Sequence, residues 1–420
     1  MSKRISGLMV GCSLLFLFFG LAAAAEPELV LMHDKGGAPN YQPVYEAMSD
    51  ACFEATGVAF KQVPYPTTEI HMAAVRTALP TNKAPELFTW WSTYRMKPLI
   101  DAGLLADLTN LWDARKGEYD PGVRGAFEFN GRVYGLPGSM AYWVVWYHKP
   151  LFEQYGLSRP NTWDEFIELC DFFKSRDIIP LGTTVQGRWP TFIYTEQFLV
   201  GMDPDFYEAL MVGKAKYTDE TAVKAFEVYK DMLKKGYFSD PGTDIWTDFP
   251  RLFGQGKAAM ILMGSWYAVT LESAGLKIGE DFDAFLMPSV NPKSGKVVIY
   301  EASSPVLVGK KSVGLKDALK VASWWLTPEG QYMFGSLSGG QIPCNTATDI
   351  SYLPQVKQNI VKTLKTEGYR LVNRYWEATP TDICEEAVDK FAEFILKPDA
   401  YMQVLGDLEK IAQDYWREHK

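Results

Sequence analysis

Histidine and cysteine are scarce in this chain, which contains four histidines and five cysteines among 420 residues. There is no CxxC pair and no HExxH sequence, and the histidines lie far apart. A metal site with the usual ligand spacing is therefore not expected, and neither is a cofactor. The chain also lacks a GxSxG nucleophile elbow and a Walker phosphate loop, so the sequence favours a binding role over an enzymatic one.

Positive charge is in deficit, with 42 Lys and Arg against 51 Asp and Glu and a net charge of −9. Such a chain repels nucleic acid and anionic membranes, so neither is expected as a partner. Two of the basic residues, Lys3 and Arg4, precede an apolar stretch and four alanines at 22–25. This pattern predicts a secretory signal peptide over 1–25, cleaved near Ala25.

Two other readings of the N-terminus are disfavoured. A transmembrane anchor would need a longer apolar stretch, and a lipoprotein cleavage site at Cys12 would place most of that stretch after the cysteine. No later run approaches eighteen apolar residues. In an oxidising compartment the cysteines at 52, 170, 344 and 384 permit zero, one or two disulfides, and Cys344 with Cys384 is the first pair to test.

The rest of the chain has an ordinary globular composition, with 47% hydrophobic and 22% charged residues. Apolar periodicity predicts alternating strands and helices, with strands at 28–32, 58–63, 86–89 and 179–184 and helices at 41–56, 69–79, 94–102 and from 162, 218 and 327. This alternation indicates an α/β architecture with a largely parallel sheet. No flexible linker is visible, which favours domains built from interleaved segments.

Four segments resemble the sugar-binding family of ABC-transporter solute-binding proteins, the group that includes maltose-binding protein. His148 stands where the family usually has asparagine. The segments are 130–137 (NGRVYGLP) with 146–149 (WYHK), 160–166 (PNTWDEF), 253–260 (FGQGKAAM) with 264–266 (GSW), and 322–331 (ASWWLTPEGQ).

The resemblance implies a two-lobed periplasmic-binding-protein fold of type II-like topology, with the ligand in a cleft between lobes joined by hinge crossings. Lobe one would comprise 26–141 plus 300–342, and lobe two 142–299 plus 343–420. The implied function is periplasmic binding of a sugar or polyol by hinge closure, as a monomer that serves the permease subunits of an ABC importer. A non-sugar solute, a sensory role and a secreted carbohydrate-active enzyme remain as alternatives.

Candidate ligand residues follow the predicted strands, because ligands of doubly wound sheets bind at the carboxyl ends of strands. Asp34 and Lys35 follow the first strand, and Trp90 and Trp91 follow the third. Indole rings suit the apolar C–H face of a sugar, and polar side chains suit its hydroxyls. We therefore expect both kinds of side chain to meet at one edge of the sheet.

The resemblance adds candidates in the second lobe and at the crossings. Gly264 would permit a close backbone approach beside Trp266. Residues 301–304 depart from the family, in which glycines are common at this crossing, and their bulk implies a smaller pocket. The added candidates are Trp143, Gln186, Trp189, Trp266, Glu301, Ser303 and Gln341. Arg374 and Trp376 carry only a weak local signal.

Overall fold

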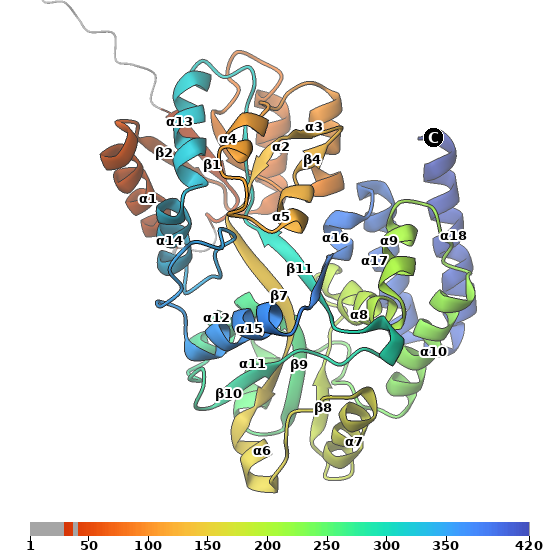
Figure 1. Cartoon of the computed structure of the whole chain (residues 1–420). Coiled ribbons are helices and arrows are strands. Elements are labelled where there is room, and N and C mark those ends of the chain that lie inside the picture. The colour runs from red at the N-terminus through yellow and green to blue at the C-terminus, as the bar shows by residue number, and fades with distance from the viewer. Residues whose placement is uncertain (1–28, 37–40, 420) are drawn as a thin grey trace, which may run out of the picture.

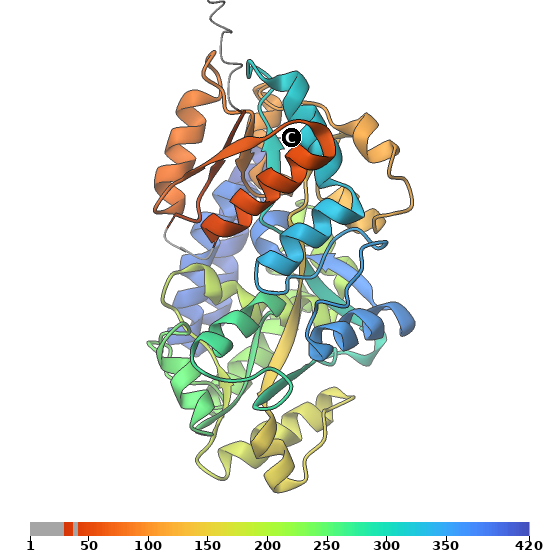
Figure 2. The same cartoon turned by 90° about the vertical axis from the view of Figure 1, so that its left-hand side faces the viewer.

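The computed structural model describes residues 29–36 and 41–419, so the predicted signal peptide lies outside the described residues. Two β-sheets covered by helices form two lobes, stacked one above the other in Figures 1 and 2. Each lobe has its own cluster of buried hydrophobic side chains. The predicted α/β, two-lobed fold is therefore confirmed. Below, lobe one denotes the five-stranded sheet with its helices, and lobe two the six-stranded sheet with its helices.

Lobe one has the strand order β2-β1-β3-β12-β6. Its order reverses between β1 and β3, which pair in parallel, and ligands of open α/β sheets bind at such a switch point. The elements are β1 (Leu29–His33), α1 (Tyr41–Thr56), β2 (Phe60–Pro64), α2 (Thr68–Ala78), β3 (Leu87–Thr89), η1 (Thr93–Arg95), α3 (Lys97–Asp101), α4 (Thr109–Asp113), α5 (Pro121–Gly125), the hairpin β4 (Glu128–Phe129) and β5 (Arg132–Val133), β6 (Gly135–Leu136), β12 (Val306–Val308), α13 (Leu315–Trp325) and α14 (Pro328–Leu337).

Lobe two has the strand order β13-β11-β7-β9-β8, with β10 paired to β7. Its strands are β7 (Ser139–His148), β8 (Ile179–Gly182), β9 (Ala258–Gly264), β10 (Phe282–Phe285), β11 (Val297–Ser303) and β13 (Arg370–Asn373). Its helices are α6 (Lys149–Tyr155), α7 (Trp163–Lys174), α8 (Phe192–Met202), α9 (Pro204–Met211), α10 (Glu220–Lys234), α11 (Asp248–Gly254), α12 (Ala268–Ser273), α15 (Gln355–Thr366), α16 (Tyr375–Ala378), α17 (Thr381–Leu396) and α18 (Tyr401–Glu418); short 3₁₀ turns are η2 (Trp189–Thr191), η3 (Ser265–Tyr267), η4 (Pro292–Ser294) and η5 (Pro398–Ala400).

The expectation of a largely parallel sheet is wrong, because both sheets are mixed. Parallel pairs join β1 to β2 and β3, β8 to β9, and β11 to β13. Apart from the separate β4–β5 hairpin, every antiparallel pair includes β6, β7 or β12. These three strands belong to the segments that pass between the lobes. The chain enters a lobe and later leaves it in the opposite direction. Strands from the two passages therefore lie antiparallel where they pair.

The segments that pass between the lobes lie side by side. Strand β7 pairs with β11 over 139–142 and with β9 over 143–147. A third segment joins them where the Met140 N–H donates to the carbonyl of Ile342 at 2.7 Å. Met140 packs in the lobe-one cluster and Trp143 in the lobe-two cluster. Figure 2 shows β7, in yellow, running between the lobes.

Local signals explain most element boundaries. The Thr162 hydroxyl caps α7 by accepting the Glu165 N–H at 3.3 Å, while the Glu165 carboxylate accepts the N–H of Asn161, one residue before the expected position. The helix expected at 94–102 is divided into η1 and α3. The division follows from Pro98, which stands in the first turn of α3 and starts a new helix.

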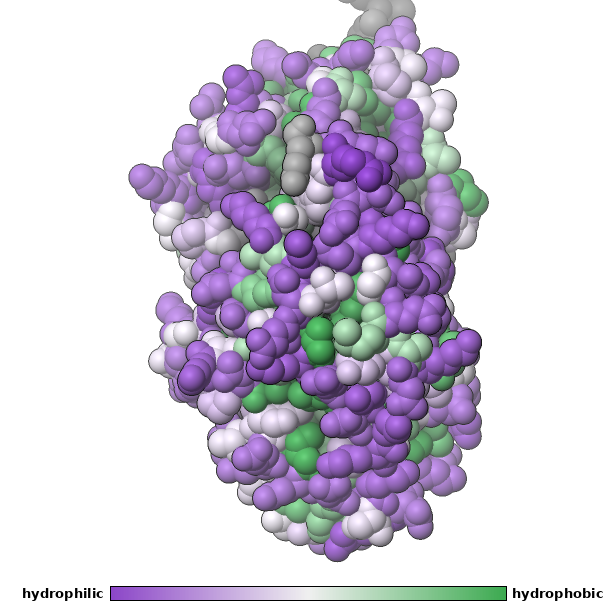
Figure 3. Space-filling model, turned by 90° about the vertical axis from the view of Figure 1, so that its right-hand side faces the viewer, coloured by the Kyte–Doolittle hydropathy of each residue, from purple (hydrophilic) through white to green (hydrophobic). Residues whose placement is uncertain are grey.

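The four described cysteines are free and buried, so the Cys344–Cys384 disulfide is not formed. Cys344 packs in the lobe-one cluster and Cys384 in the lobe-two cluster, which explains why the two thiols do not meet. Among residues 29–36 and 41–419, no helix combines the length and apolar character needed to cross a membrane. The face that carries α18 is mainly hydrophilic in Figure 3.

Candidate functional site

A pocket lies between the lobes at the carboxyl ends of β1 and β3. Its volume of about 310 Å³ is at the low end of the range for small-molecule sites, roughly 300–1,000 Å³. Both lobes and the crossing segments contribute to its wall. The lining residues are Asp34, Lys35, Tyr41, His71, Thr89, Trp90, Trp91, Ser139, Trp266, Val269, Glu301, Ala302, Ser303, Ser304, Pro305, Ser338, Gln341, Arg374 and Glu377. Eight predicted residues are among them: Asp34, Lys35, Trp90, Trp91, Trp266, Glu301, Ser303 and Gln341.

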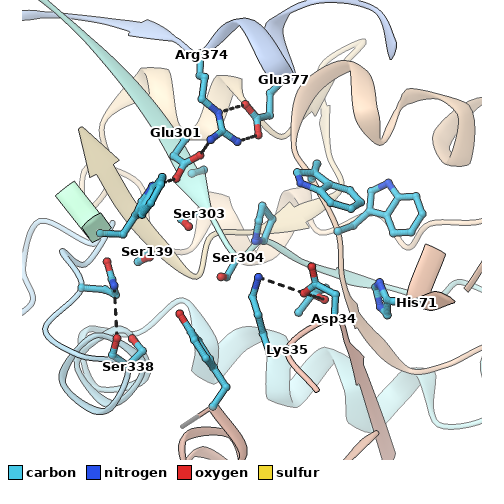
Figure 4. Close-up of a pocket in the computed structure, with 18 of the residues that line it drawn as sticks. Asp34, Lys35, His71, Ser139, Glu301, Ser303, Ser304, Ser338, Arg374 and Glu377 are labelled. Carbon is cyan, nitrogen blue, oxygen red and sulfur yellow. Dashed lines mark hydrogen bonds and ion pairs between the residues drawn. The ribbon is translucent and has the colours of Figure 1, made fainter. Parts of the chain in front are cut away.

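A buried ion-pair network forms the lobe-two wall. Arg374 follows β13 and lies between the carboxylates of Glu301 and Glu377, as Figure 4 shows. Its Nε atom donates to Glu377 Oε2 at 2.7 Å. Burial alone would lower the pKa of Arg374, but the two carboxylates raise it on balance. Burial raises the pKa of Glu301 against the opposing charge of Arg374, so this wall holds its charges largely out of water.

Trp266 is fixed in place by the same network. Its indole Nε1 donates to Glu301 Oε1 at 2.7 Å. Gly264 allows this arrangement, because a Cβ atom there would lie 2.3 Å from Trp266 Nε1 and 2.7 Å from the Trp143 ring. The absence of a side chain at the end of β9 therefore lets two indoles fold against the strand. An oriented indole in a pocket wall offers an apolar face to a ligand.

The lobe-one wall is more open and more loosely paired. Lys35 Nζ lies 3.3 Å from Asp34 Oδ1, and the two side chains are 31% and 12% exposed. Asp34 also accepts long hydrogen bonds of 3.2 Å from Thr68 and 3.4 Å from Thr89. Although burial opposes the change, Lys35 and then His71 lower the pKa of Asp34. This carboxylate is therefore charged at neutral pH.

Trp90 and Trp91 complete this wall after β3. Their rings meet edge to face with centroids 5.4 Å apart. The Trp90 indole N–H donates to the carbonyl of Arg95 at 3.0 Å, which fixes the orientation of its ring. His71 lies beside Asp34 in Figure 4, and burial lowers its pKa. The wall thus combines indoles with a charged pair and a neutral imidazole.

Serine side chains from the crossing segments line the floor of the pocket. The hydroxyls of Ser139, Ser303 and Ser304 have no hydrogen-bond partner among the residues that the structure describes. Ser304 has a φ of 48°, a conformation in which non-glycine residues are uncommon. A Cβ at Gly138 would lie 2.5 Å from the Ser304 carbonyl oxygen. The close approach of the two segments places these hydroxyls where a ligand can reach them.

Three predicted residues lie outside the pocket wall. Trp143 is buried behind it, with its ring against Trp266 and Arg374. Trp189 lies against the Trp266 ring, 6.1 Å away between centroids. Gln186 is exposed, and its amide donates to the carbonyl of Gly242. The β8 loop therefore ends against the indole cluster around Trp266 rather than at the pocket itself.

The model of the bacterial extracellular solute-binding protein family matches residues 36–332. This match covers more than half of the chain. The chain belongs to this family. The membership confirms the resemblance found in the sequence, and the family consists of binding proteins.

Individual relatives of this solute-binding protein are distant. An uncharacterised ABC transporter extracellular-binding protein of Pyrococcus horikoshii is 31% identical over 57% of this chain and 54% of its own length. The chain thus spans about half of that relative. A probable sugar-binding periplasmic protein of Mesorhizobium japonicum is 24% identical over 68% of this chain and 69% of its own, and a maltotriose-binding protein of Pyrococcus abyssi is 22% identical over 81% and 71%.

Solved structures share the fold over nearly the whole chain. A bacterial solute receptor described as preferring β-D-galactopyranose has a TM-score of 0.78 at 19% identity. The superposition covers 92% of this chain and 99% of the receptor chain. A chitin oligosaccharide binding protein has a TM-score of 0.78 at 20% identity, with coverage of 93% and 100%. At these identities the likeness shows that the solute-binding protein has their fold.

Several wall residues were missed from the sequence or given little weight. Arg374, which was given little weight, has the most central position of these, and a stronger signal for it existed. It directly follows β13, just as Asp34 and Trp90 follow their strands, but no strand was predicted over 370–373. Glu377 then follows one helical turn after Arg374. His71, Ser139 and Ser338 carry no local signal, because their position depends on how distant segments cross.

Proposed function

We propose that this protein captures a small neutral sugar or polyol between its lobes and delivers it to the permease subunits of an ABC importer. One observation carries the proposal, namely that the pocket charges are paired with one another. Arg374 is paired with both Glu301 and Glu377, and Lys35 lies beside Asp34, so neither cation is without a carboxylate partner. An anionic ligand would have to displace one of these carboxylates, whereas a neutral polyhydroxy ligand can hydrogen-bond to the paired groups intact.

The remaining wall suits such a ligand. Trp90, Trp91 and Trp266 supply apolar faces for C–H groups, and the serine hydroxyls of the floor supply donors and acceptors. The volume of about 310 Å³ favours one or two sugar rings over a long oligosaccharide. The relatives named as sugar-binding and maltotriose-binding proteins support the same ligand class.

The lobes would act as the moving parts. We assign 26–141 plus 300–342 to lobe one and 142–299 plus 343–420 to lobe two, with one adjustment. Glu301 lies where β11 crosses between the lobes and is counted with the lobe-two wall because it pairs with Arg374. Cys344 and Leu353 pack in the lobe-one cluster while Val356 packs in the lobe-two cluster, which supports placing the third boundary between 353 and 356. Ligand would stabilise the closed arrangement through contacts made with both walls.

Location, partner and oligomeric state belong to the same proposal. Export behind the predicted signal peptide would place a monomer in the periplasm, where it meets the permease. A hydrolytic role is less well supported. Glycosidases need one carboxyl group as acid and a second as base or nucleophile, whereas Glu301 and Glu377 are both held by Arg374.

Calorimetric titration of the purified mature protein tests the ligand class. Neutral monosaccharides, disaccharides and polyols form one series, and a uronate, a sugar phosphate and an amino sugar of matched size form another. The proposal expects binding within the neutral series and much weaker binding of the charged analogues. Binding of the charged series alone, or of no sugar in either series, would contradict it.

A further inference from the structure

The lobes touch each other directly at one flank of the pocket. On lobe one the contact is made by η1, which comes just after Trp90 and Trp91. On lobe two it is made by α16, the turn that follows Arg374 and carries Glu377, and by Glu385 of α17. Two short segments next to the pocket walls therefore meet across the cleft.

Arg95 makes the central contact of this flank. Its side chain is only 5% exposed, and its Nη1 atom lies 2.9 Å from Glu385 Oε1. Its Nε atom donates to the carbonyl of Trp376 at 3.3 Å, and its guanidinium carbon lies 3.9 Å from the centroid of the Trp376 ring. All three of these partners belong to lobe two. A lobe-one cation is thus buried against the other lobe.

The neighbours of Arg95 also contact lobe two. The Thr93 hydroxyl donates to the carbonyl of Glu377, and Tyr94 meets Trp416 edge to face at 6.4 Å. Thr93 has a φ of 50°, which a β-branched residue rarely adopts. Such a conformation persists only where surrounding contacts hold it. Three consecutive residues of η1 are therefore engaged by the opposite lobe.

We propose that Arg95 is a positioning residue that clasps the lobes together and aligns the two walls of the ligand pocket. On one side its carbonyl accepts the Trp90 indole N–H, so it is joined to the lobe-one wall. On the other side its guanidinium holds Trp376, whose neighbour Glu377 pairs with Arg374. The clasp consists of protein groups only, so it stabilises this arrangement of the lobes whether or not ligand is bound.

The consequence for binding follows from population arithmetic. The apparent dissociation constant equals the intrinsic one divided by the fraction of molecules in the binding-competent arrangement. Loss of the clasp lowers that fraction without removing a ligand contact. Dissociation should then become faster, and affinity should fall for every ligand by the same factor. This part of the inference rests on the proposed function, whereas the effect on the ligand-free shape does not.

Arg188 provides a matched control. It also pairs with Glu385, at 3.3 Å, and with Asp389, at 2.8 Å. Arg188 and both of these partners belong to lobe two, so its ion pairs do not join the lobes. Replacement of Arg188 removes an arginine from the same carboxylate but leaves every interlobe contact of Arg95 in place. Any effect specific to Arg95 is therefore an effect of the interlobe contact.

Arg95→Ala, Arg95→Lys and Arg188→Ala are compared with the parent by small-angle X-ray scattering and calorimetry. We expect Arg95→Ala to enlarge the radius of gyration of the ligand-free protein and to weaken binding of the best neutral sugar about tenfold. Arg95→Lys should give values between those of Arg95→Ala and the parent, because lysine keeps the charge but loses the flat contact of the guanidinium with the Trp376 ring. Arg188→Ala should match the parent in both measurements.

The inference is overturned if Arg95→Ala leaves both the radius of gyration and the affinity at parental values. It is also overturned if Arg188→Ala has the same effects as Arg95→Ala. If Arg95→Ala does not fold, Glu385→Gln is used instead, because it removes the carboxylate partner while Arg95 stays in place. Glu385→Gln also breaks the pair with Arg188, and Arg188→Ala measures the effect of losing that pair alone. If no neutral sugar binds the parent, the proposed function fails, and the scattering comparison alone decides on the clasp.

Discussion

The two walls of the pocket hold their polar groups in different ways. On lobe two, Arg374, Glu301 and Glu377 are buried and tightly paired, with side chains 11%, 7% and 2% exposed. On lobe one, Asp34 and Lys35 are paired at 3.3 Å, and the lysine is 31% exposed. Water therefore competes with the lobe-one pair but hardly with the lobe-two network.

This difference teaches which wall is fixed and which can adjust. The lobe-two network orients Trp266 before any ligand arrives, so the cost of ordering that wall is met during folding. The lobe-one pair is partly exposed and can shift to hydrogen-bond to a ligand while its two members stay paired. Substitutions in the two walls should consequently separate effects on folding from effects on binding, and the predictions below run from the largest expected effect to the smallest.

Arg374→Met should have the largest effect on folding. It leaves the carboxylates of Glu301 and Glu377 buried without a cation, which typically costs about 3–5 kcal/mol. Urea denaturation monitored by tryptophan fluorescence measures the loss. The triple variant R374M/E301Q/E377Q removes the charges together and should recover most of it. A loss below about 1 kcal/mol would show that this wall is not the rigid one.

Glu196 should make stability depend on pH through the same network. This glutamate is buried, and its carboxylate accepts the Tyr375 N–H at 2.7 Å. Burial raises its pKa well above 4.5. Because the folded state holds this proton more tightly than the unfolded state does, its contribution to stability falls as pH rises from 4.5 to the folded pKa.

The variant Glu196→Gln isolates this contribution, since the amide oxygen can still accept the Tyr375 N–H. The stability of Glu196→Gln relative to the parent should increase with pH above 4.5, by at most about 1.4 kcal/mol per pH unit. Denaturation curves collected from pH 4.5 to 8 provide the comparison. A difference that stays constant over this range, or that shrinks as pH rises, would contradict the raised pKa.

The sequence predicted the secondary structure correctly where local side-chain chemistry determines where an element begins or ends. The helix predicted over 41–56 is α1, and the polar cap at Thr162 starts α7. The rule that ligands sit beyond strand ends placed Asp34, Lys35, Trp90 and Trp91 in one pocket. The same rule could not predict the direction of the strands that cross between the lobes, because that direction depends on the long-range path of the chain.

The lobe-two wall shows why the rest was not predictable. Strand β13 has only four residues, so its sequence gave no clear signal and Arg374 was assigned little weight. Trp189 was expected at the ligand because the family resemblance implies it, yet it packs on Trp266 instead. A local pattern identifies a side chain able to bind a sugar. Whether that side chain faces the pocket depends on long-range packing, which here places Trp266 in the wall and Trp189 outside it.

Trp266 tests whether the fixed wall also contributes to binding. Trp266→Ala should weaken binding of a neutral sugar about 10- to 100-fold, because burial of an aromatic side chain is worth roughly 1.5–3 kcal/mol. Trp266→Phe keeps an apolar ring but loses the N–H bond to Glu301 and should lie between. Calorimetry measures both. Gln186 lies outside the pocket wall, so Gln186→Ala should change affinity by no more than about twofold. A loss of affinity as large as that of Trp266→Ala would mean that the wall residues are wrongly assigned.

Lys35 gives the smallest expected effect and the sharpest contrast with Arg374. Lys35→Met removes one partner of a partly exposed pair, so the free energy of unfolding should change by less than about 0.5 kcal/mol. Asp34 keeps its hydrogen bonds from Thr68 and Thr89 and is not left isolated. Loss of the ammonium donor should still weaken sugar binding about three- to tenfold, since one hydrogen bond to a ligand hydroxyl is lost. Urea denaturation and calorimetry on the same preparation separate these effects. If Lys35→Met lowered stability as much as Arg374→Met, the lobe-one wall would be as rigid as the other, and adaptability could not be assigned to it.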